Sequence, residues 1–302
     1  MRAVHAANRL AVMITQGAAL VVLIFVLNRV VPGDTVDVLA LQGDLTPAQQ
    51  AEMRRELGLD RSSAAQFIDW SARALAGDLG QSLRFGRPVA DMVAQAIPTT
   101  LALAAGSFIV GLALALGLAI GAAMTGSRAL AACVDAVNLW SIAIPTFCAG
   151  VVGILLFSIW LGWLPVIGSF VLPVLILGID NAGQIVKPLH EELREASAAA
   201  HVRTARAKGL PPWRIAVFHL LPTAAPVTLA LSGLVLTSLV AGTLTLEVLF
   251  GLPGLGSLTL NAVRGRDYPV LQAAAVVIAL GLVLINGLAD LLNRLIDPRL
   301  EQ

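Results

Sequence analysis

The sequence predicts an all-α integral membrane protein with six transmembrane helices. Of its 302 residues, 57% are apolar and only 13% are charged, and the mean hydropathy of +0.83 is far above that of a water-soluble domain. Apolar windows of about 20 residues, long enough to cross a hydrocarbon core of ~30 Å, recur along the chain. We expect the spans near residues 10–31, 100–124, 133–161, 169–187, 215–246 and 270–292.

The first span lies within residues 1–31 and is expected to be retained. Arg2 and Arg9 precede its apolar run, which is also typical of a secretory signal. However, the run from Leu10 to Val31 is long enough to cross a membrane, and no small-residue cleavage site follows it. We therefore interpret it as an N-terminal transmembrane helix.

Residues 32–98 form the one long polar block, and their acidic balance favours the outer side of the membrane. Thr46 is expected to cap a helix that starts at Pro47 and ends near Gly58. Residues 62–80 predict a second amphipathic helix. Both helices are too short to bury a core of their own. We predict a small helical insertion between spans one and two, followed by a five-helix core over residues 99–302.

The orientation follows from the lysine and arginine residues in the short loops. Arg264 and Arg266 fall on the opposite face without reversing the balance. Both termini are thus predicted to be cytoplasmic, and residues 188–214 form the main cytoplasmic loop. The residues on the cytoplasmic face are Arg2, Arg9, Arg128, Lys187, Arg194, Arg203, Arg206, Lys208, Arg214, Arg294 and Arg299.

This basic loop predicts a helix, a tight turn and a second helix. Good helix formers fill residues 191–208, Gly209 stands at the expected left-handed C-cap, and Pro211 and Pro212 suit the start of the next helix. Ala205 and Gly209 would share one helical face, where small residues let another protein approach closely. The alternative is that the cations only fix the topology and contact anionic lipid.

Asp180 is the most distinctive candidate for a functional residue in the predicted spans. It follows Ser169, at the outer start of the fourth span, by eleven residues, so at ~1.5 Å per residue it lies near the midplane of the bilayer. Asn181 is adjacent and Gln184 is one turn away. An acid at this depth either lines a pathway, where it would favour cationic cargo, or is a hydrogen-bonded structural group.

Polar residues in the fifth span allow the same two readings. They can line a pore or join helices. The residues are Ser232, Thr237, Ser238, Thr243 and Thr245, of which we assign Ser238 to the candidate pathway.

Several functions are excluded by what the sequence lacks. A net charge of +1 and few aromatic residues argue against nucleic-acid binding. No phosphate-binding loop with its lysine occurs, and the four histidines fall at cytoplasmic positions, so we expect no catalytic residues, no cofactor and no metal site. Cys133 and Cys148 fall in one predicted helix, ~22 Å apart, and cannot bridge there.

The stretch HVRTARAKGL at residues 201–210 resembles the cytoplasmic loop of ATP-binding-cassette importer membrane subunits, in particular those of the peptide/nickel subgroup of binding-protein-dependent transport components. Arg203, Thr204 and Ala205 occupy the opening positions of the family's Glu-Ala-Ala motif and Gly209 its glycine, although the glutamate is absent. Other stretches typical of the subgroup follow the same order, at residues 30–34, 56–60, 77–83, 97–104, 161–165, 247–256, 266–270 and 297–300.

This resemblance implies a non-catalytic permease subunit, similar to dipeptide and oligopeptide permeases, in a bacterial cytoplasmic membrane. The insertion would then be periplasmic, and Arg203, Thr204, Ala205, Arg206, Ala207, Lys208 and Gly209 would form a coupling helix. The implied partners are a homologous second permease, two ATP-binding subunits, an extracytoplasmic solute-binding protein and membrane lipid. The implied cargo is a peptide, nickel or a metal chelate. A self-contained secondary transporter, which would favour inverted repeats, is the alternative.

Overall fold

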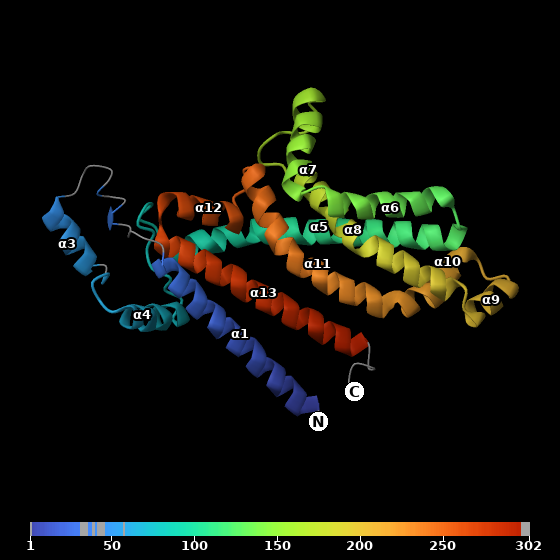
Figure 1. Ribbon diagram of the computed structural model, residues 1–302, viewed down its shortest axis with the longest axis horizontal. Coiled ribbons are helices and arrows are strands. Elements are labelled where there is room, and N and C mark those ends of the chain that lie inside the picture. Colours follow the sequence, from blue (N-terminus) through green and yellow to red (C-terminus); the bar gives the residue numbers. More distant parts are fainter. Residues whose placement is uncertain (1, 31–35, 38–39, 41–45, 57, 297–302) are drawn as a thin grey trace. The chain divides into compact units, whose positions relative to one another are not determined.

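The computed structural model describes residues 2–30, 36–37, 40, 46–56 and 58–296, which are mostly helical and contain no β-strand within these ranges (Figure 1). The chain divides into two compact units. The first comprises residues 1–100 and 253–283, and the second comprises residues 101–252 and 284–302. The boundary expected at residues 98 and 99 falls inside one continuous helix, and residues 253–283 join the N-terminal unit.

The first unit contains α1, the two insertion helices and α12, together with the first part of α5 and of α13. Their bounds are α1 Arg2–Val30, α3 Pro47–Glu56, α4 Ser63–Leu75, α5 Val89–Thr125, α12 Leu255–Gly265 and α13 Tyr268–Ile296.

The two predicted insertion helices are present. At the start of α3, the Thr46 amide donates to Gln49 Oε1 at 2.8 Å and the Gln49 amide donates to Thr46 Oγ1 at 3.4 Å, which is a capping box. Gly58 follows the helix with φ +64°. Neither α3 nor α4 contains a buried residue. Packing of Phe67 edge-on against Phe25 of α1, with ring centroids 5.1 Å apart, links α4 to the first span.

A buried carboxylate ties the loop before α5 to the start of α13. Asp267 is 1% exposed and accepts a hydrogen bond of 2.5 Å from Ser82 Oγ. The backbone amides of Leu83 and Arg84 also donate to it, each at 3.4 Å. Hydrogen bonds to a buried charge are stronger than those between neutral groups, so this cluster fixes the loop.

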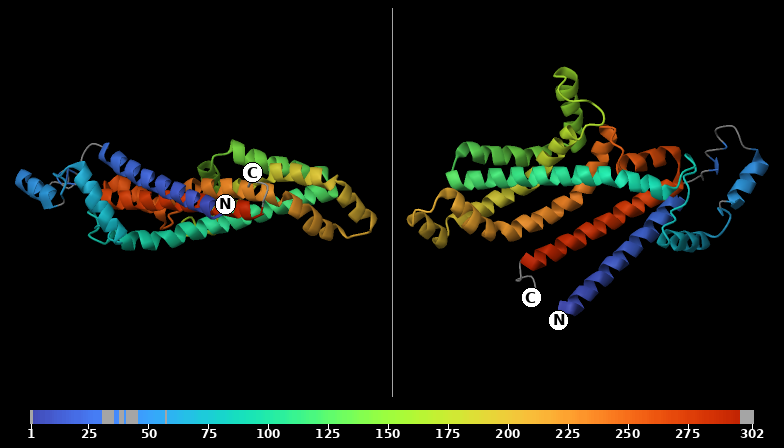
Figure 2. Two further views of the ribbon diagram at one scale, coloured as in Figure 1. Left: turned by 90° about the horizontal axis from the view of Figure 1, so that it is seen from below. Right: turned by 180° about the vertical axis from the view of Figure 1, so that it is seen from behind.

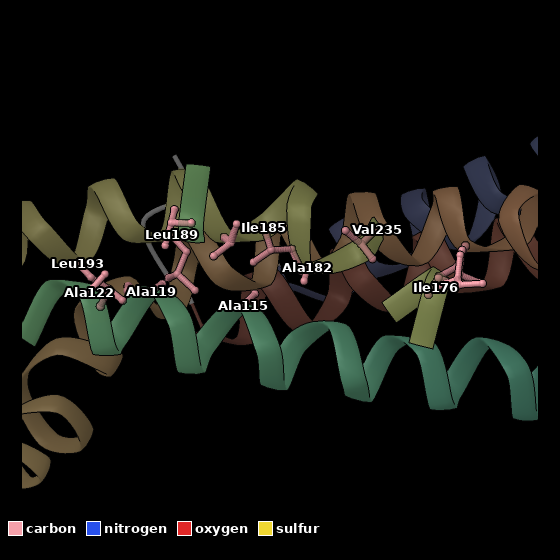
Figure 3. Packing of buried hydrophobic residues seen from close by; sticks show 14 of the residues in the cluster. Ala115, Ala119, Ala122, Ile176, Ala182, Ile185, Leu189, Leu193 and Val235 are labelled. Atoms are coloured by element: carbon pink, nitrogen blue, oxygen red, sulfur yellow. The ribbon is translucent and has the colours of Figure 1, made fainter. Parts of the chain in front are cut away.

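The second unit is built around α8. Figure 2 shows α6 and α8 side by side, and Figure 3 shows the apolar contacts of α8 with α5 at Ile185, Leu189 and Leu193 of α8 and Ala115, Ala119 and Ala122 of α5. The remaining bounds in this unit are α6 Arg128–Ala143, α7 Thr146–Gly153, η1 Ile154–Trp160, α8 Val171–Ser197, α9 Ala200–Ala207, α10 Pro212–Ile215, η2 Ala216–Leu220 and α11 Leu221–Leu249.

Small residues allow the helices around α8 to approach closely. A Cβ atom added at Gly183 of α8 would lie 2.4 Å from Ser141 Cβ and 2.6 Å from the carbonyl oxygen of Val137, both on α6. Asn138 Nδ2 donates to the carbonyl oxygen of Gly183 at 2.9 Å, which binds the same two helices. Close backbone approach and interhelical hydrogen bonds are the usual means of packing helices in membranes.

Four continuous helical segments in the described chain are long and apolar enough to cross a membrane. They are residues 9–30, 89–125, 212–249 and 268–291, and the bent pair α6 with α7 and η1 makes a fifth if it counts as one span. α8 is not among them, because Asp180, Gln184 and Lys187 lower its hydropathy. It tolerates them because Asp180 and Gln184 are half-buried against neighbouring helices, and because the exposed Lys187 pairs with Asp135 of α6 at 3.0 Å.

The third predicted span is not one continuous helix. A bend of 105° separates α6 from α7 and η1, and the latter two project away from α6 (Figures 1 and 2). The bend falls at Ile144, which adopts the extended conformation favoured before a proline, here Pro145. The prediction that Cys133 and Cys148 share one helix was therefore wrong, since they lie on α6 and α7, and both are free.

The predicted helix over residues 191–208 is also interrupted. α8 continues through Pro188 to Ser197, and α9 starts at Ala200. Ala199 between them is extended, with ψ 151°. No helix-breaking residue marks this point in the sequence. The interruption lets α9 turn its own apolar residues into the core, which outweighs the local helix propensity of alanine.

Candidate functional site

The end of α9 is a closed hydrogen-bonded turn centred on Gly209. This residue has φ +72°, and its amide donates to the carbonyl oxygen of Arg206 at 2.9 Å. The Leu210 amide donates to the carbonyl oxygen of Ala205 at 3.2 Å. These two bonds form a Schellman motif, as the sequence predicted for a glycine C-cap. Pro211 then caps α10.

The inner face of α9 is buried in the unit's own core. Val202 is 0% and Ala205 is 4% exposed, and both belong to the main apolar cluster. The expectation that Ala205 and Gly209 present one outward face of small residues was therefore wrong. Ala205 instead lets α9 pack closely on the chain itself. The outward residues are Arg203, Thr204, Arg206, Ala207, Lys208 and Gly209.

The outward face of α9 is basic and exposed. Arg203, Arg206 and Lys208 form no ion pair with any residue in the described part of the chain. Nearby, Trp213 is 58% exposed, and the guanidinium of Arg214 lies 5.3 Å from its ring centroid. A partner that fits this surface would offer acidic groups and an apolar contact for the indole.

The packing of α9 against the helical segment that follows it was not predicted. The His201 ring on α9 stacks on the His219 ring of η2, with centroids 6.4 Å apart. At the end of η2 the Leu221 amide donates to the carbonyl oxygen of Ala216, a π-helical bond. Pro222, which has no amide hydrogen, follows at once and prevents regular α-helical bonding to Phe218. Pro222 was therefore the signal in the sequence from which the π-helical segment could have been predicted.

A second candidate feature is a cavity of about 310 Å³ in the second unit. It brings together Asp180, Asn181 and Ser238, three of the four residues that the sequence assigned to a pathway. α7, α8 and α11 supply its walls, which are Thr146, Phe147, Leu177, Asp180, Asn181, Ser238, Ala241, Gly242 and Thr245.

The fourth predicted residue, Gln184, connects the cavity walls rather than lining the cavity. Its Nε2 donates to Asp180 Oδ2 at 3.4 Å, and its Oε1 accepts from Ser238 Oγ at 3.4 Å. Ser141 also hydrogen-bonds to the Asp180 side chain. Asn181 is 1% exposed, and neither polar atom of its amide has a partner among the described residues. The polar groups thus form a cluster on α8 and α11.

The polar residues of the fifth span fall into two groups. Ser238 and Thr245 face the cavity, whereas Ser232 and Thr243 are buried and donate to carbonyl oxygens of their own helix. Thr237 donates to Asn286 of α13.

Thr146 and Phe147 were missed by sequence reasoning. They reach the cavity because the chain bends just before them, at Pro145.

No cluster of three or more histidine, cysteine or acidic side chains suited to a metal ion occurs in the described parts of the chain.

Comparison with known proteins adds a family and several relatives. The family model for the binding-protein-dependent transport system inner membrane component matches residues 113–302, which include α9 and the cavity. A putative peptide permease protein of Brucella suis is 33% identical, with 94% of each chain covered. The di/tripeptide transport system permease protein DppB of Pseudomonas aeruginosa is 30% identical, with 98% of each chain covered.

A solved structure has the same fold over most of this chain. It is the MetNI methionine ABC transporter in an inward-facing conformation, with a TM-score of 0.55 and 21% sequence identity. The match covers 68% of this chain and 96% of the solved chain. At this level of identity the likeness concerns the fold alone.

Proposed function

The chain belongs to the family of binding-protein-dependent transport system inner membrane components, and from this membership we propose that it forms half of the pathway of an ATP-driven peptide importer. It is a multi-pass permease component of the inner membrane. In the proposed topology, α8 and the bent α6, α7 and η1 segment complete six spans, and both termini are cytoplasmic. Residues 32–98 then form a periplasmic insertion.

The observation that carries the proposal is the exposed face of α9. Its three cations, which form no ion pair with the described residues, stand on a helix whose other face is anchored by Val202 and Ala205, so a force applied there is transmitted to the core. We assign residues 203–209 to contact with an ATP-binding subunit, except that Ala205 acts from the inner side.

ATP hydrolysis is assigned to two separate subunits, and the other half of the pathway to a homologous second permease. A solute-binding protein would deliver the cargo from outside. ATP-driven closure of the two ATPases would move α9 and, through it, α11, and so switch the pathway between its outward-facing and inward-facing states. The stacked His201 and His219 rings are one direct contact along that route.

The cavity between α7, α8 and α11 is our candidate for part of the pathway, with Asp180, Asn181 and Ser238 on its wall and Gln184 behind them. Peptides are the favoured cargo, because the relatives that match over nearly their whole length are named as peptide permeases. Nickel or a metal chelate receives no comparable support.

The proposal is tested by measuring ATP hydrolysis in two preparations. The purified chain alone is expected to hydrolyse no ATP. The complete complex is expected to hydrolyse ATP faster when peptide-loaded binding protein is added. Robust hydrolysis by the isolated chain would contradict the proposal, and so would a complete complex whose rate of ATP hydrolysis does not change when loaded binding protein is added.

A further inference from the structure

The insertion helix α4, in the first unit, carries an exposed stripe of aliphatic side chains. At about 100° per residue, positions 64, 68, 72 and 75 fall within an arc of about 80° and extend ~16 Å along the helix. These positions are Ala64, Ile68, Ala72 and Leu75, and all four are exposed. The two large side chains, Ile68 and Leu75, are 65% and 91% exposed. The stripe is thus an apolar surface without a polar residue.

The polar side of α4 is engaged within the first unit. Gln66 accepts a hydrogen bond from the Arg29 guanidinium of α1, and its Nε2 donates to the carbonyl oxygen of Arg61 at 2.8 Å. Asp69 forms an ion pair with Arg61. At the helical repeat, Gln66 and Asp69 lie about 100° or more from Ile68 at the centre of the stripe. The stripe is therefore directed away from these contacts.

The contacts with α1 place α4 at the level of the last turns of a span (Figure 1). Phe67 of α4 packs against Phe25, which precedes Val30 at the end of α1 by five residues, or ~7.5 Å. Gln66 contacts Arg29, in the final turn. A long cationic side chain at the end of a span keeps its charge at the water boundary. α4 thus lies at the boundary between hydrocarbon and headgroups.

The end of α1 presents an apolar surface at the same level. Val26, Leu27 and Val30 are 49%, 55% and 71% exposed, and they belong to a segment long and apolar enough to cross a membrane. An interfacial helix buries its apolar side about 5–10 Å into the boundary between headgroups and acyl chains. The aliphatic stripe of α4 and its depth beside α1 suit this arrangement.

We propose that α4 lies on the outer surface of the bilayer with its aliphatic stripe in the outer leaflet, an inference that rests on the importer topology proposed above. The partner of this surface is the boundary between the phospholipid headgroups and their acyl chains. The contact anchors the polar insertion beside the outer end of α1. It gives the insertion a fixed position although neither α3 nor α4 contains a buried residue.

A solute-binding protein fits the stripe less well than lipid does. It must bind and leave in every transport cycle, and interfaces of that kind are about as polar as the rest of a protein surface. They are enriched in aromatic residues and arginine and depleted in alanine. The stripe consists of two alanines, one isoleucine and one leucine. Its chemistry is that of a lipid contact.

The test uses nitroxide labels on the assembled transporter, with both permeases and both ATPases, in phospholipid nanodiscs. Cys133 and Cys148 are first replaced by serine, and single labels are then placed through Ile68→Cys and Leu75→Cys. Power-saturation electron paramagnetic resonance measures how often each label collides with O₂, which concentrates in lipid, and with the neutral nickel complex of ethylenediamine diacetate, which stays in water.

Two reference positions calibrate the ratio of the two collision rates. Leu27→Cys, on the exposed apolar side of α1, is the lipid reference, and Glu52→Cys, whose parent side chain is 67% exposed on α3, is the water reference. We expect the O₂-to-nickel ratio at positions 68 and 75 to exceed that at position 52 at least fivefold and to lie within threefold of that at position 27.

Two outcomes overturn the proposal. A ratio at positions 68 and 75 that is less than fivefold above the water reference shows that the stripe faces water. Collision rates with both reagents that are below one third of those at the two references show that another protein covers the stripe, whether the binding protein or the second permease.

The same preparations separate this inference from the importer function. Stimulation of ATP hydrolysis by loaded binding protein is measured in the parent complex and in each labelled variant. If stimulation is absent from the parent complex, the importer function itself is wrong. If stimulation is present and the labels at positions 68 and 75 face water or protein, the importer function stands and only the membrane contact of α4 is wrong.

Discussion

Replacing Gly209 by valine tests how the α9 turn acts. Nothing lies within 4 Å of a Cβ atom built at Gly209, so the change creates no clash. The effect comes from φ +72°, which costs an L-residue roughly 1–2 kcal/mol and a β-branched residue more. If the turn opens instead, the two Schellman bonds are lost, at about 0.5–1.5 kcal/mol each.

Since about 1.4 kcal/mol is a factor of ten, Gly209→Val should lower the equilibrium constant between the intact and the open turn about tenfold or more. We expect uptake and ATPase coupling to fall well below the parent values while the chain still inserts in the membrane. Gly209→Asn should remain within about threefold of the parent, because asparagine tolerates the left-handed conformation. The assay is ATP-driven uptake at equal expression, with the amount of co-purified ATPase measured in the same membranes.

Gly162→Val is the matched control. Gly162 has φ +63° and open space around its Cβ position, but it lies in the loop after η1 rather than in the α9 turn. It therefore introduces similar backbone strain without altering the proposed coupling surface. Normal uptake by Gly209→Val, or an equal loss in Gly162→Val, would refute the reasoning.

Further substitutions test the packing within each unit. Gly183→Ala places a methyl group 2.4 Å from Ser141 Cβ and should destabilise the chain by about 1–3 kcal/mol. Its control is Gly117→Ala, which has nothing within 4 Å of the new Cβ atom and should be neutral or stabilise the chain by up to ~1 kcal/mol. Equal unfolding temperatures for the two variants would contradict this account. Ser82→Ala removes a buried hydrogen bond to Asp267 and should cost about 1.5–3 kcal/mol, seen as a lower unfolding temperature of the purified protein, and an unchanged temperature would mean that the carboxylate is satisfied without the serine.

The ends of several helices were predictable because their signals are local. Thr46 and Gly58 frame α3, and Gly209 ends α9, within a few residues of sequence in each case. The family resemblance, which rests on short motifs distributed along the chain, is confirmed by the family match and by relatives that cover nearly the whole chain. That membership favours the importer over a self-contained secondary transporter.

The direction of each element was much less predictable. The mean hydropathy of a window carries no information on the direction of the backbone. The bend at Ile144 was therefore missed, although the proline that follows it is a signal for such a bend. Which face of α9 points inward depends on distant residues that form the core, so the burial of Ala205 could not be inferred from its neighbours. The cavity depends on the same bend, because it brings Thr146 and Phe147 to α8 and α11.

The central claim, that the outward face of α9 contacts an ATP-binding subunit, is tested most directly by site-specific photo-crosslinking. A benzophenone amino acid replaces the exposed Ala207 in the assembled transporter, and Trp163, which is 69% exposed in the loop after η1, serves as the control position. We expect a covalent adduct with the ATP-binding subunit from position 207 and none from position 163. A transporter that hydrolyses ATP normally yet gives no such adduct from position 207 would contradict the account.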